Sequence, residues 1–252
     1  MWHRREVVLG GALTLLFASS QSCYCHDASA PHSRGCCLHP DDVNSIYPSG
    51  TSTALSGDDT IIPNSGDREF DFALAQTLYM LSKKFDVRPG FAYYDDSAGQ
   101  NAYATPTVRL SNADGTVLFG KGLLSKLRHM QESPEVGVAG VCAHEFGHIV
   151  QYRLGLIDKV NAGQPTAKRC ELQADYLAGY FAGLRKLEHP NFPAAIVGVT
   201  LRGFGDTLFN DPGHHGTPEE RGFAVMRGFE AASSGKGLND AIEESTTYVL
   251  SI

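Results

Sequence analysis

The pentapeptide His144-Glu145-Phe146-Gly147-His148 lies inside a segment with strong helical character. Residues four apart on a helix share one face, so His144 and His148 can present two imidazoles to one metal ion, with Glu145 beside them. A catalytic zinc ion takes three protein ligands and keeps one position open for water, and a neighbouring carboxylate can accept a proton from that water. The motif therefore predicts the metal helix of a zinc hydrolase. The alternative is a surface helix that carries two histidines by chance.

A second helix-forming segment downstream can complete such a site. Residues 171–179, with the sequence E-L-Q-A-D-Y-L-A-G, follow a turn region marked by Gly and Pro, and Glu171 and Asp175 lie four residues apart on one helical face. We expect Glu171 to be the third zinc ligand, and Asp175 to accept the second N–H of a ligand histidine and so fix its tautomer. A pair of this kind is usually a solvated helix face. The apolar residues around this one indicate a packed environment instead.

H-E-x-x-H followed by E-x-x-x-D is the gluzincin pattern, and the chain resembles two groups of gluzincins. These are the zinc metallopeptidases of the CAAX-prenyl-protease and heat-shock-protease type, and the neutral zinc metallopeptidases. Residues 101–104 (N-A-Y-A) resemble their N-A-F-A segment, and residues 116–124 (T-V-L-F-G-K-G-L-L) resemble their strand that leads into G-L-L. Residues 215–221 (H-G-T-P-E-E-R) are similar to their H-G-T or H-P segment ending in E-x-R. The resemblance covers about residues 67–230 and implies a zincin-like peptidase domain.

The resemblance also implies roles for the downstream segment. Its histidine is expected to reach the active site, which makes His215 a candidate donor to the tetrahedral intermediate, while Arg221 anchors the segment through an Asp or Glu. His214-His215-Gly216 stands where many members have His-Pro, so the choice between the two histidines stays open.

A peptidase mechanism follows from these residues. One zinc ion per chain, bound by His144, His148 and Glu171, lowers the pKa of a water molecule, and Glu145 takes the proton as general base and passes it to the leaving amine. The expected partner is a peptide or protein substrate, and endopeptidase action is favoured over exopeptidase action. A catalytically silent peptide-binding or chaperone-like protein on the same scaffold is the alternative. A purely structural zinc site would need a closing fourth ligand, and the sequence offers no evident candidate.

Composition and charge exclude some other classes. The chain has 252 residues, is 42% hydrophobic and carries a net charge of -7 without a stripe of Lys and Arg. Nucleic acid is therefore not expected as a partner, and one compact domain over residues 67–252 is predicted. Residues 115–122 nearly spell a phosphate-binding loop, G-x-x-x-x-G-K-[ST], but Gly122 replaces the hydroxyl that binds magnesium.

The first residues predict an export signal. Arg4-Arg5 precedes an apolar run over residues 9–18, so residues 1–22 are predicted to be a signal peptide of the twin-arginine type and the protein to be periplasmic or secreted. An N-terminal membrane anchor is the alternative, but the run is shorter than the roughly 20 residues of a spanning helix. A lipid on Cys23 is disfavoured because Ser20-Gln21-Ser22 is a poor lipobox. No second apolar stretch is long enough to cross a bilayer.

The six cysteines fall into two groups. Cys23, Cys25, Cys36 and Cys37 lie in residues 23–66, which are predicted to be a flexible segment, and three disulfide pairings are open to them. The other two, Cys142 and Cys170, lie close to the proposed zinc ligands in the sequence. The sequence leaves a structural bridge between them and two buried thiols as equal alternatives.

Hydrophobic periodicity and turn residues predict a mainly helical α+β domain with a small β-sheet beside the metal helix. The expected helices span residues 67–85, 123–131, 134–154, 170–187, 217–229 and 238–248, and the expected strands span residues 91–94, 107–110 and 116–119. An edge strand of such a sheet could hold an extended peptide by strand addition.

Overall fold

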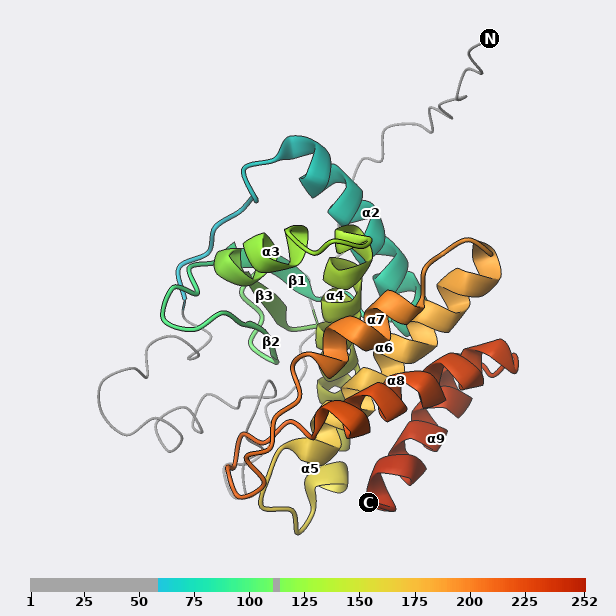
Figure 1. Ribbon diagram of the computed structural model, residues 1–252. Helices are drawn as coiled ribbons and strands as arrows, with labels where there is room; N and C mark the ends of the chain where they lie inside the picture. The colour runs from blue at the N-terminus through green and yellow to red at the C-terminus, as the bar shows by residue number, and fades with distance from the viewer. Residues whose placement is uncertain (1–58, 111–113) are drawn as a thin grey trace.

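The computed structural model describes residues 59–110 and 114–252 (Figure 1). The predicted signal peptide and the four N-terminal cysteines lie outside the described residues. The predicted fold class is confirmed, because helices dominate and three short strands form one mixed sheet. In chain order the elements are α2 (Arg68–Phe85), β1 (Gly90–Tyr94), β2 (Ala102–Thr105), β3 (Thr116–Gly120), α3 (Lys121–Arg128), α4 (Pro134–Leu154), α5 (Leu156–Asn161), α6 (Lys168–Glu188), α7 (Ala195–Arg202), α8 (Pro218–Ser233) and α9 (Leu238–Leu250).

Helix α4, which carries the pentapeptide, runs through the middle of the molecule. Pro134 occupies its first turn, where a missing N–H costs nothing, and Gly155 ends it in a left-handed conformation (φ 61°). Every residue from Val136 to Gln151 is buried. Figure 1 shows the sheet on one side of α4 and the helices α6 to α9 on the other. A helix that is covered all round can hold polar groups only where other elements satisfy them.

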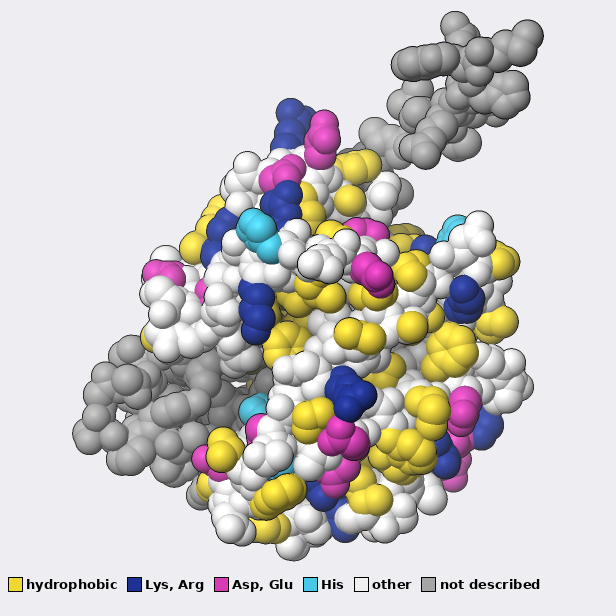
Figure 2. All heavy atoms as spheres, viewed as in Figure 1, with side chains coloured by type: hydrophobic (Ala, Val, Ile, Leu, Met, Phe, Trp, Pro, Cys, Tyr) yellow, Lys and Arg dark blue, Asp and Glu magenta, His cyan; other side chains and the backbone are white. Residues whose placement is uncertain are grey.

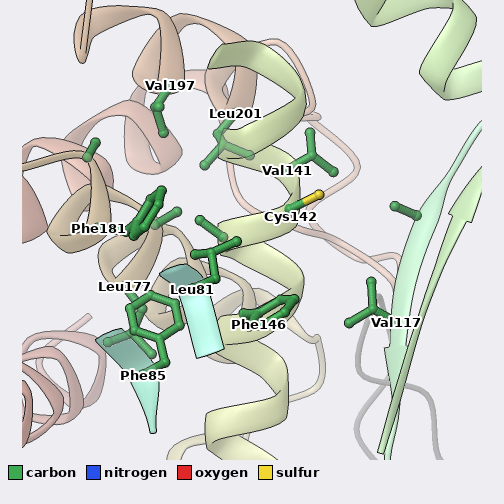
Figure 3. Close-up of a cluster of buried hydrophobic side chains, with 14 of the residues drawn as sticks. Leu81, Phe85, Val117, Val141, Cys142, Phe146, Leu177, Phe181, Val197 and Leu201 are labelled. Atoms are coloured by element: carbon green, nitrogen blue, oxygen red, sulfur yellow. The ribbon is translucent and has the colours of Figure 1, made fainter. Parts of the chain in front are cut away.

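The hydrophobic core joins α4 to the surrounding elements. Figure 3 shows Phe146 of α4 between the sheet and the helices that lie opposite it. The core side chains labelled there include Leu81 and Phe85 of α2, Val117 of β3, and Leu177 and Phe181 of α6. All of these side chains are buried. The pentapeptide is therefore part of the core as well as of the candidate site.

Helices α6 and α8 pack backbone against backbone. A Cβ added to Gly179 of α6 would lie 1.9 Å from the carbonyl oxygen of Val225, and one added to Gly228 of α8 would lie 1.8 Å from that of Tyr176. Real Cβ atoms do not approach an oxygen so closely, so only glycine permits this crossing. The close crossing fixes the position of α6, the helix that carries Glu171 and Asp175.

The sheet has the strand order β1-β3-β2, with β1 parallel and β2 antiparallel to β3. The predicted strands at residues 91–94 and 116–119 are confirmed, but the strand predicted at residues 107–110 is wrong. Strand β2 instead uses Ala102–Thr105, and the chain then folds back after Pro106, which has no N–H for a ladder. The Thr116 hydroxyl holds this turn, because it accepts from the backbone N–H of Arg109 (3.0 Å) and donates to the carbonyl of Thr107 (2.8 Å).

The other predicted helices are present with small shifts at their ends. Asp67 caps α2 by accepting from the backbone N–H of Phe70, and Thr217 and Glu220 form a reciprocal capping box at the start of α8. The helix predicted over residues 123–131 begins earlier, at Lys121, and ends at Arg128. The short helices α5 and α7 were not predicted. Each has eight residues or fewer, too few to show a clear helical period.

Asp96 explains why the near match to a phosphate-binding loop is not one. Its buried carboxylate accepts from the backbone N–H groups of Gly122 (2.6 Å) and Leu123 (2.9 Å) at the start of α3. A helix N-terminus offers such N–H groups to an anion. Here the chain's own carboxylate takes the place that a phosphate would need.

Within the described ranges 59–110 and 114–252, no helix is both long and apolar enough to cross a membrane. On the face shown in Figure 2, basic and acidic side chains are interspersed. The exclusion of nucleic acid as a partner stays a prediction from composition.

Candidate metal centre

The side chains of the three predicted zinc ligands converge. His144 and His148 lie one turn apart on α4, and Glu171 extends from the first turn of α6. The two Nε2 atoms are 3.0 Å apart, Glu171 Oε2 lies 3.3 Å from His144 Nε2, and Glu171 Oε1 lies 3.6 Å from His148 Nε2. All three side chains are buried, and one ligand atom from each lies within 4.8 Å of the others. The group could therefore hold a metal ion.

The hydrogen bonds of the two rings fit a cation at this position. His144 Nδ1 lies 2.8 Å from Asp175 Oδ1, and His148 Nδ1 lies 2.8 Å from Gln151 Oε1. Both oxygens accept, so each neutral ring carries its proton on Nδ1 and turns the lone pair of Nε2 toward Glu171. Two lone pairs and a carboxylate so close together repel one another unless a cation lies between them. Tetrahedral zinc with ligand bonds of about 2.0–2.1 Å would set its ligand atoms about 3.3 Å apart, which agrees with the observed spacing.

Gly147 allows α4 and α6 to approach each other at this site. A Cβ added to Gly147 would lie 3.0 Å from the Cα and 3.2 Å from the Cβ of Ala174, which stands between Glu171 and Asp175 on α6. Such contacts are tighter than nine in ten real Cβ contacts, so α4 and α6 would have to shift. The glycine inside the pentapeptide therefore helps to bring the histidines within reach of Glu171.

Asp175 contacts both a ligand histidine and Arg221 of α8. Arg221 donates from Nε to Oδ2 (2.8 Å) and from Nη2 to Oδ1 (2.9 Å). Burial alone would raise the pKa of Asp175, but the charge of Arg221 and the contact with His144 lower it below its usual range. The carboxylate is therefore ionised and accepts from the His144 ring. The acid that Arg221 was expected to bind is Asp175.

Burial also sets the protonation states of the ligands. It lowers the pKa of His148 to about 4, so this ring is neutral at pH 7, which is the form that binds metals. For Glu171, burial raises the pKa, but the interactions of its carboxylate with His148, His215 and His144 outweigh it and bring the pKa well below its usual range. A neutral imidazole and an ionised carboxylate are the forms that zinc requires.

Glu145 lies next to the ligands and is buried. Its Oε2 has no hydrogen-bond partner within the part of the chain that the structure describes. Burial raises the pKa of Glu145 to about 8; His144 opposes this rise, while Glu171 adds to it. A divalent cation beside it would add positive charge and lower this pKa. Without a cation the Glu145 carboxyl therefore holds its proton at pH 7, and a bound cation would favour the carboxylate that can accept one.

The loop between α7 and α8 brings His214 and His215 next to Asp206. The Asp206 carboxylate lies 2.5 Å from His214 Nδ1 and accepts from the backbone N–H of His215 at 3.0 Å. The side chain of His214 is buried, whereas that of His215 is 33% exposed. The charge of His215 also contributes to the lowered pKa of Glu171. His215 is therefore the more accessible of the two rings, with Nδ1 3.4 Å from Asp206 Oδ2, while His214 packs into its own loop. The role of His215 in the active site stays a prediction.

The comparison with family models identifies the chain. The model described as "Putative neutral zinc metallopeptidase" matches residues 110–237, about half of the chain. The chain belongs to this family. All the proposed zinc ligands and the residues Glu145, Asp175, His215 and Arg221 lie in the matched range. Neither the curated proteins nor the solved structures contain a match to the chain. The resemblance to the CAAX-prenyl-protease and heat-shock-protease type stays a prediction.

The two cysteines near the candidate metal centre are free thiols. Cys142 and Cys170 are both buried and form no disulfide with each other. Of the two alternatives from the sequence, a bridge or two buried thiols, the structure has the buried thiols. Burial raises the pKa of the Cys142 thiol above its usual range, which keeps the thiol protonated. Cys142 belongs to the hydrophobic core cluster beside α4.

The structure adds two residues that sequence reasoning missed. Gln151 accepts from the His148 ring, and it lies three positions later on the same helix. This spacing places two side chains on one face, so the contact could have been predicted. Asp206 gave no such signal, because its contacts with His214 and His215 depend on the path of a loop.

Proposed function

We propose that this metallopeptidase hydrolyses peptide bonds, with Glu145 as general base. One observation carries the proposal: a buried carboxyl group with an unpartnered oxygen among the described residues adjoins three convergent metal ligands. A structural site would surround its metal with four protein ligands. Here the described residues contribute a cluster of three, which leaves a position open.

His144, His148 and Glu171 would hold one zinc ion per chain. When bound, zinc lowers the pKa of a water molecule and polarises the substrate carbonyl. Asp175 and Gln151 orient the two rings through their Nδ1 atoms. The burial of all three ligands keeps bulk water away from them, which strengthens each electrostatic interaction in the site.

Glu145 and His215 supply the proton transfer and the charge stabilisation. Glu145 accepts a proton from the attacking water, and a group with a pKa near neutrality can then return it to the leaving amine. His215 would donate a hydrogen bond to the oxygen that gains negative charge as the carbonyl carbon becomes tetrahedral. Asp206 holds the backbone of His215 and so fixes where this ring stands.

The proposed substrate is an extended peptide, bound along strand β2. In the strand order β1-β3-β2, this strand is at the edge of the sheet. The Tyr152 hydroxyl of α4 donates to the carbonyl of Ala104 in β2 at 3.3 Å. A peptide added beside β2 would run close to the metal helix, and its main-chain N–H would replace the Tyr152 hydroxyl at the Ala104 carbonyl. Endopeptidase action is proposed over exopeptidase action, and cleavage of a peptide blocked at both ends tests it.

Casein digestion tests the function. The full chain should digest casein, lose this activity with a chelator and recover it with zinc. Glu145→Gln should bind zinc and be inactive, because an amide cannot accept the proton. Glu135→Gln, on an exposed turn of the same helix, is the matched control and should be fully active. Activity in a zinc-free preparation, or in Glu145→Gln, would contradict the proposal.

The second candidate, a silent peptide-binding protein, predicts a different result. Such a protein would bind casein peptides equally well with Glu145 or Gln at this position and would release no products. The buried carboxyl of Glu145 favours the peptidase, since an unpartnered polar group in a core costs stability and persists where it has a use. We also propose export to the periplasm or the medium, which cell fractionation with an antibody to the chain tests.

A further inference from the structure

The contact between His148 and Gln151 is the first link of a buried polar chain. Gln151 Oε1 faces His148 Nδ1 at 2.8 Å, while Gln151 Nε2 donates to the carbonyl of Cys170 (2.8 Å) and to Gln173 Oε1 (3.0 Å). Cys170 directly precedes Glu171 in the chain. The amide of Gln151 therefore joins one proposed ligand to the backbone beside another.

The polar chain continues from Gln173 to the C-terminal helix α9. Gln173 Nε2 donates to the hydroxyls of Ser245 (3.2 Å) and Thr246 (2.8 Å). Both hydroxyls donate in turn to the carbonyl of Ile242, each at 2.8 Å. The side chains of Gln151, Gln173, Ser245 and Thr246 are all buried. In such a place each hydrogen bond is strong and each unmade one is costly.

Two backbone carbonyls, those of Cys170 and Ile242, determine the direction of the hydrogen bonds along this polar chain. A carbonyl oxygen can only accept, so Cys170 requires the amide nitrogen of Gln151, and the oxygen of Gln151 must then face His148. At the other end, Ser245 and Thr246 each have one O–H, and the Ile242 carbonyl takes both. Their oxygens can therefore only accept from Gln173, whose own oxygen is left for Gln151.

We propose that Gln151 and Gln173 are positioning residues that hold the proton of His148 on Nδ1, with α9 supporting their orientation. The lone pair of His148 Nε2 then points toward His144 and Glu171 before a metal arrives. The inference rests on the proposed function in one respect, that His148 is a zinc ligand. Helix α9, about a hundred residues downstream of His148 in the sequence, thereby gains a role in metal affinity.

Zinc affinity, measured by competition with a coloured chelator, is the first test. Removing a partner of a ligand histidine typically weakens metal binding about 10–100-fold, and we expect this loss for Gln151→Leu. Gln151→Glu keeps an acceptor for His148 Nδ1 and should bind zinc close to the wild-type level, even though it loses the donor to Cys170. A purely structural role would weaken both variants alike. Gln131→Leu, at an exposed position, is the matched control.

The tautomer of His148 is the second test and needs no metal. Nitrogen NMR of the zinc-stripped full chain, labelled on histidine, should show His148 protonated on Nδ1, and Gln151→Leu should lose this preference. The double variant Ser245→Ala, Thr246→Val removes both acceptors of Gln173 without touching the metal centre. It should shift the same signal and weaken zinc binding by a smaller factor.

These measurements separate the inference from the proposed function. If the wild type binds no zinc but His148 shows the expected tautomer and loses it in Gln151→Leu, the metal assignment fails and the positioning role stands. If folded Gln151→Leu keeps both the tautomer and the zinc affinity of the wild type, the positioning role is overturned. An unchanged His148 signal in the folded double variant would remove α9 from the proposal.

Discussion

Arg221 and Asp175 form a two-point ion pair in the protein interior, with N–O distances of 2.8 and 2.9 Å. Asp175 Oδ1 also contacts His144 Nδ1. One carboxylate thus joins α8 to a proposed zinc ligand on α4. Both partners of the ion pair are almost completely buried, so neither charge can be solvated if the other is removed.

Replacing Arg221 should therefore be costly. Arg221→Ala leaves the charge of Asp175 buried without its main partner, and breaking a buried pair in this way costs about 3–5 kcal/mol. Arg227→Ala is the control, because Arg227 of α8 pairs with Glu244 of α9 and both side chains are partly exposed. That change should cost about 1 kcal/mol or less. Urea unfolding of the two variants measures the difference, and equal losses would contradict the assignment of a buried pair.

Helix ends were predictable because their signals are local. The bounds of α4 follow from Pro134 at its first turn and Gly155 after its last, and the structure has the same bounds. The convergence of His144, His148 and Glu171 was predictable in outline, since the spacing of residues on each helix limits which side chains can share a metal. The strand prediction failed at residues 107–110. Strand β2 ends before Pro106, and the chain then folds back.

Contacts made by loops and by close helix crossings were not predictable in this way. Asp206 and His215 are nine positions apart in a loop, so no helical or strand period relates them. The path of the loop brings the Asp206 carboxylate to the backbone N–H of His215. The crossing of α6 and α8 depends on Gly179 and Gly228 together. A glycine inside a predicted helix lowers the stability of that helix unless it permits a close contact with a neighbouring helix. The sequence does not show which neighbouring helix that is.

That crossing gives a second prediction. In Gly228→Ala the new methyl group would overlap the carbonyl oxygen of Tyr176, so α6 and α8 must move apart. Overpacking typically costs about 1–3 kcal/mol, occasionally more, and the overlap with backbone places this variant at the upper end. Zinc affinity should fall too, because Glu171 and Asp175 move with α6.

Gly222→Ala on the same helix is the control for Gly228. A Cβ there meets nothing closer than 3.8 Å, so alanine should raise the stability by up to about 1 kcal/mol through its higher helix propensity. Thermal unfolding of both variants checks the pair. A stable Gly228→Ala variant with normal zinc binding would show that α6 and α8 can separate freely.

Asp206 gives a prediction for acid stability. Burial would raise the pKa of Asp206, but the backbone N–H of His215 and the ring of His214 lower it to about 2. Because the folded pKa lies below the unfolded one, the ionised carboxylate stabilises the fold above about pH 4 and this contribution is lost as the pH falls toward 2. Asp206→Asn should therefore be less stable than the wild type at pH 7, and the difference should shrink between pH 4 and pH 2. Urea unfolding across this range measures it, and a difference that does not change with pH would contradict the cause given for the lowered pKa.

The two adjacent histidines should respond differently to removal. His214 is buried and its ring contacts Phe209, with centroids 5.4 Å apart, so His214→Ala should lower the stability of the loop. His215 is partly exposed and interacts electrostatically with Glu171. His215→Ala should therefore keep the fold and the zinc, and reduce turnover about a hundredfold, as the loss of one donor to a developing oxyanion does. Turnover and zinc content, measured together on folded protein, separate the two roles. Full activity in His215→Ala removes this residue from the mechanism. If instead His214→Ala alone loses turnover while keeping fold and zinc, the donor is His214.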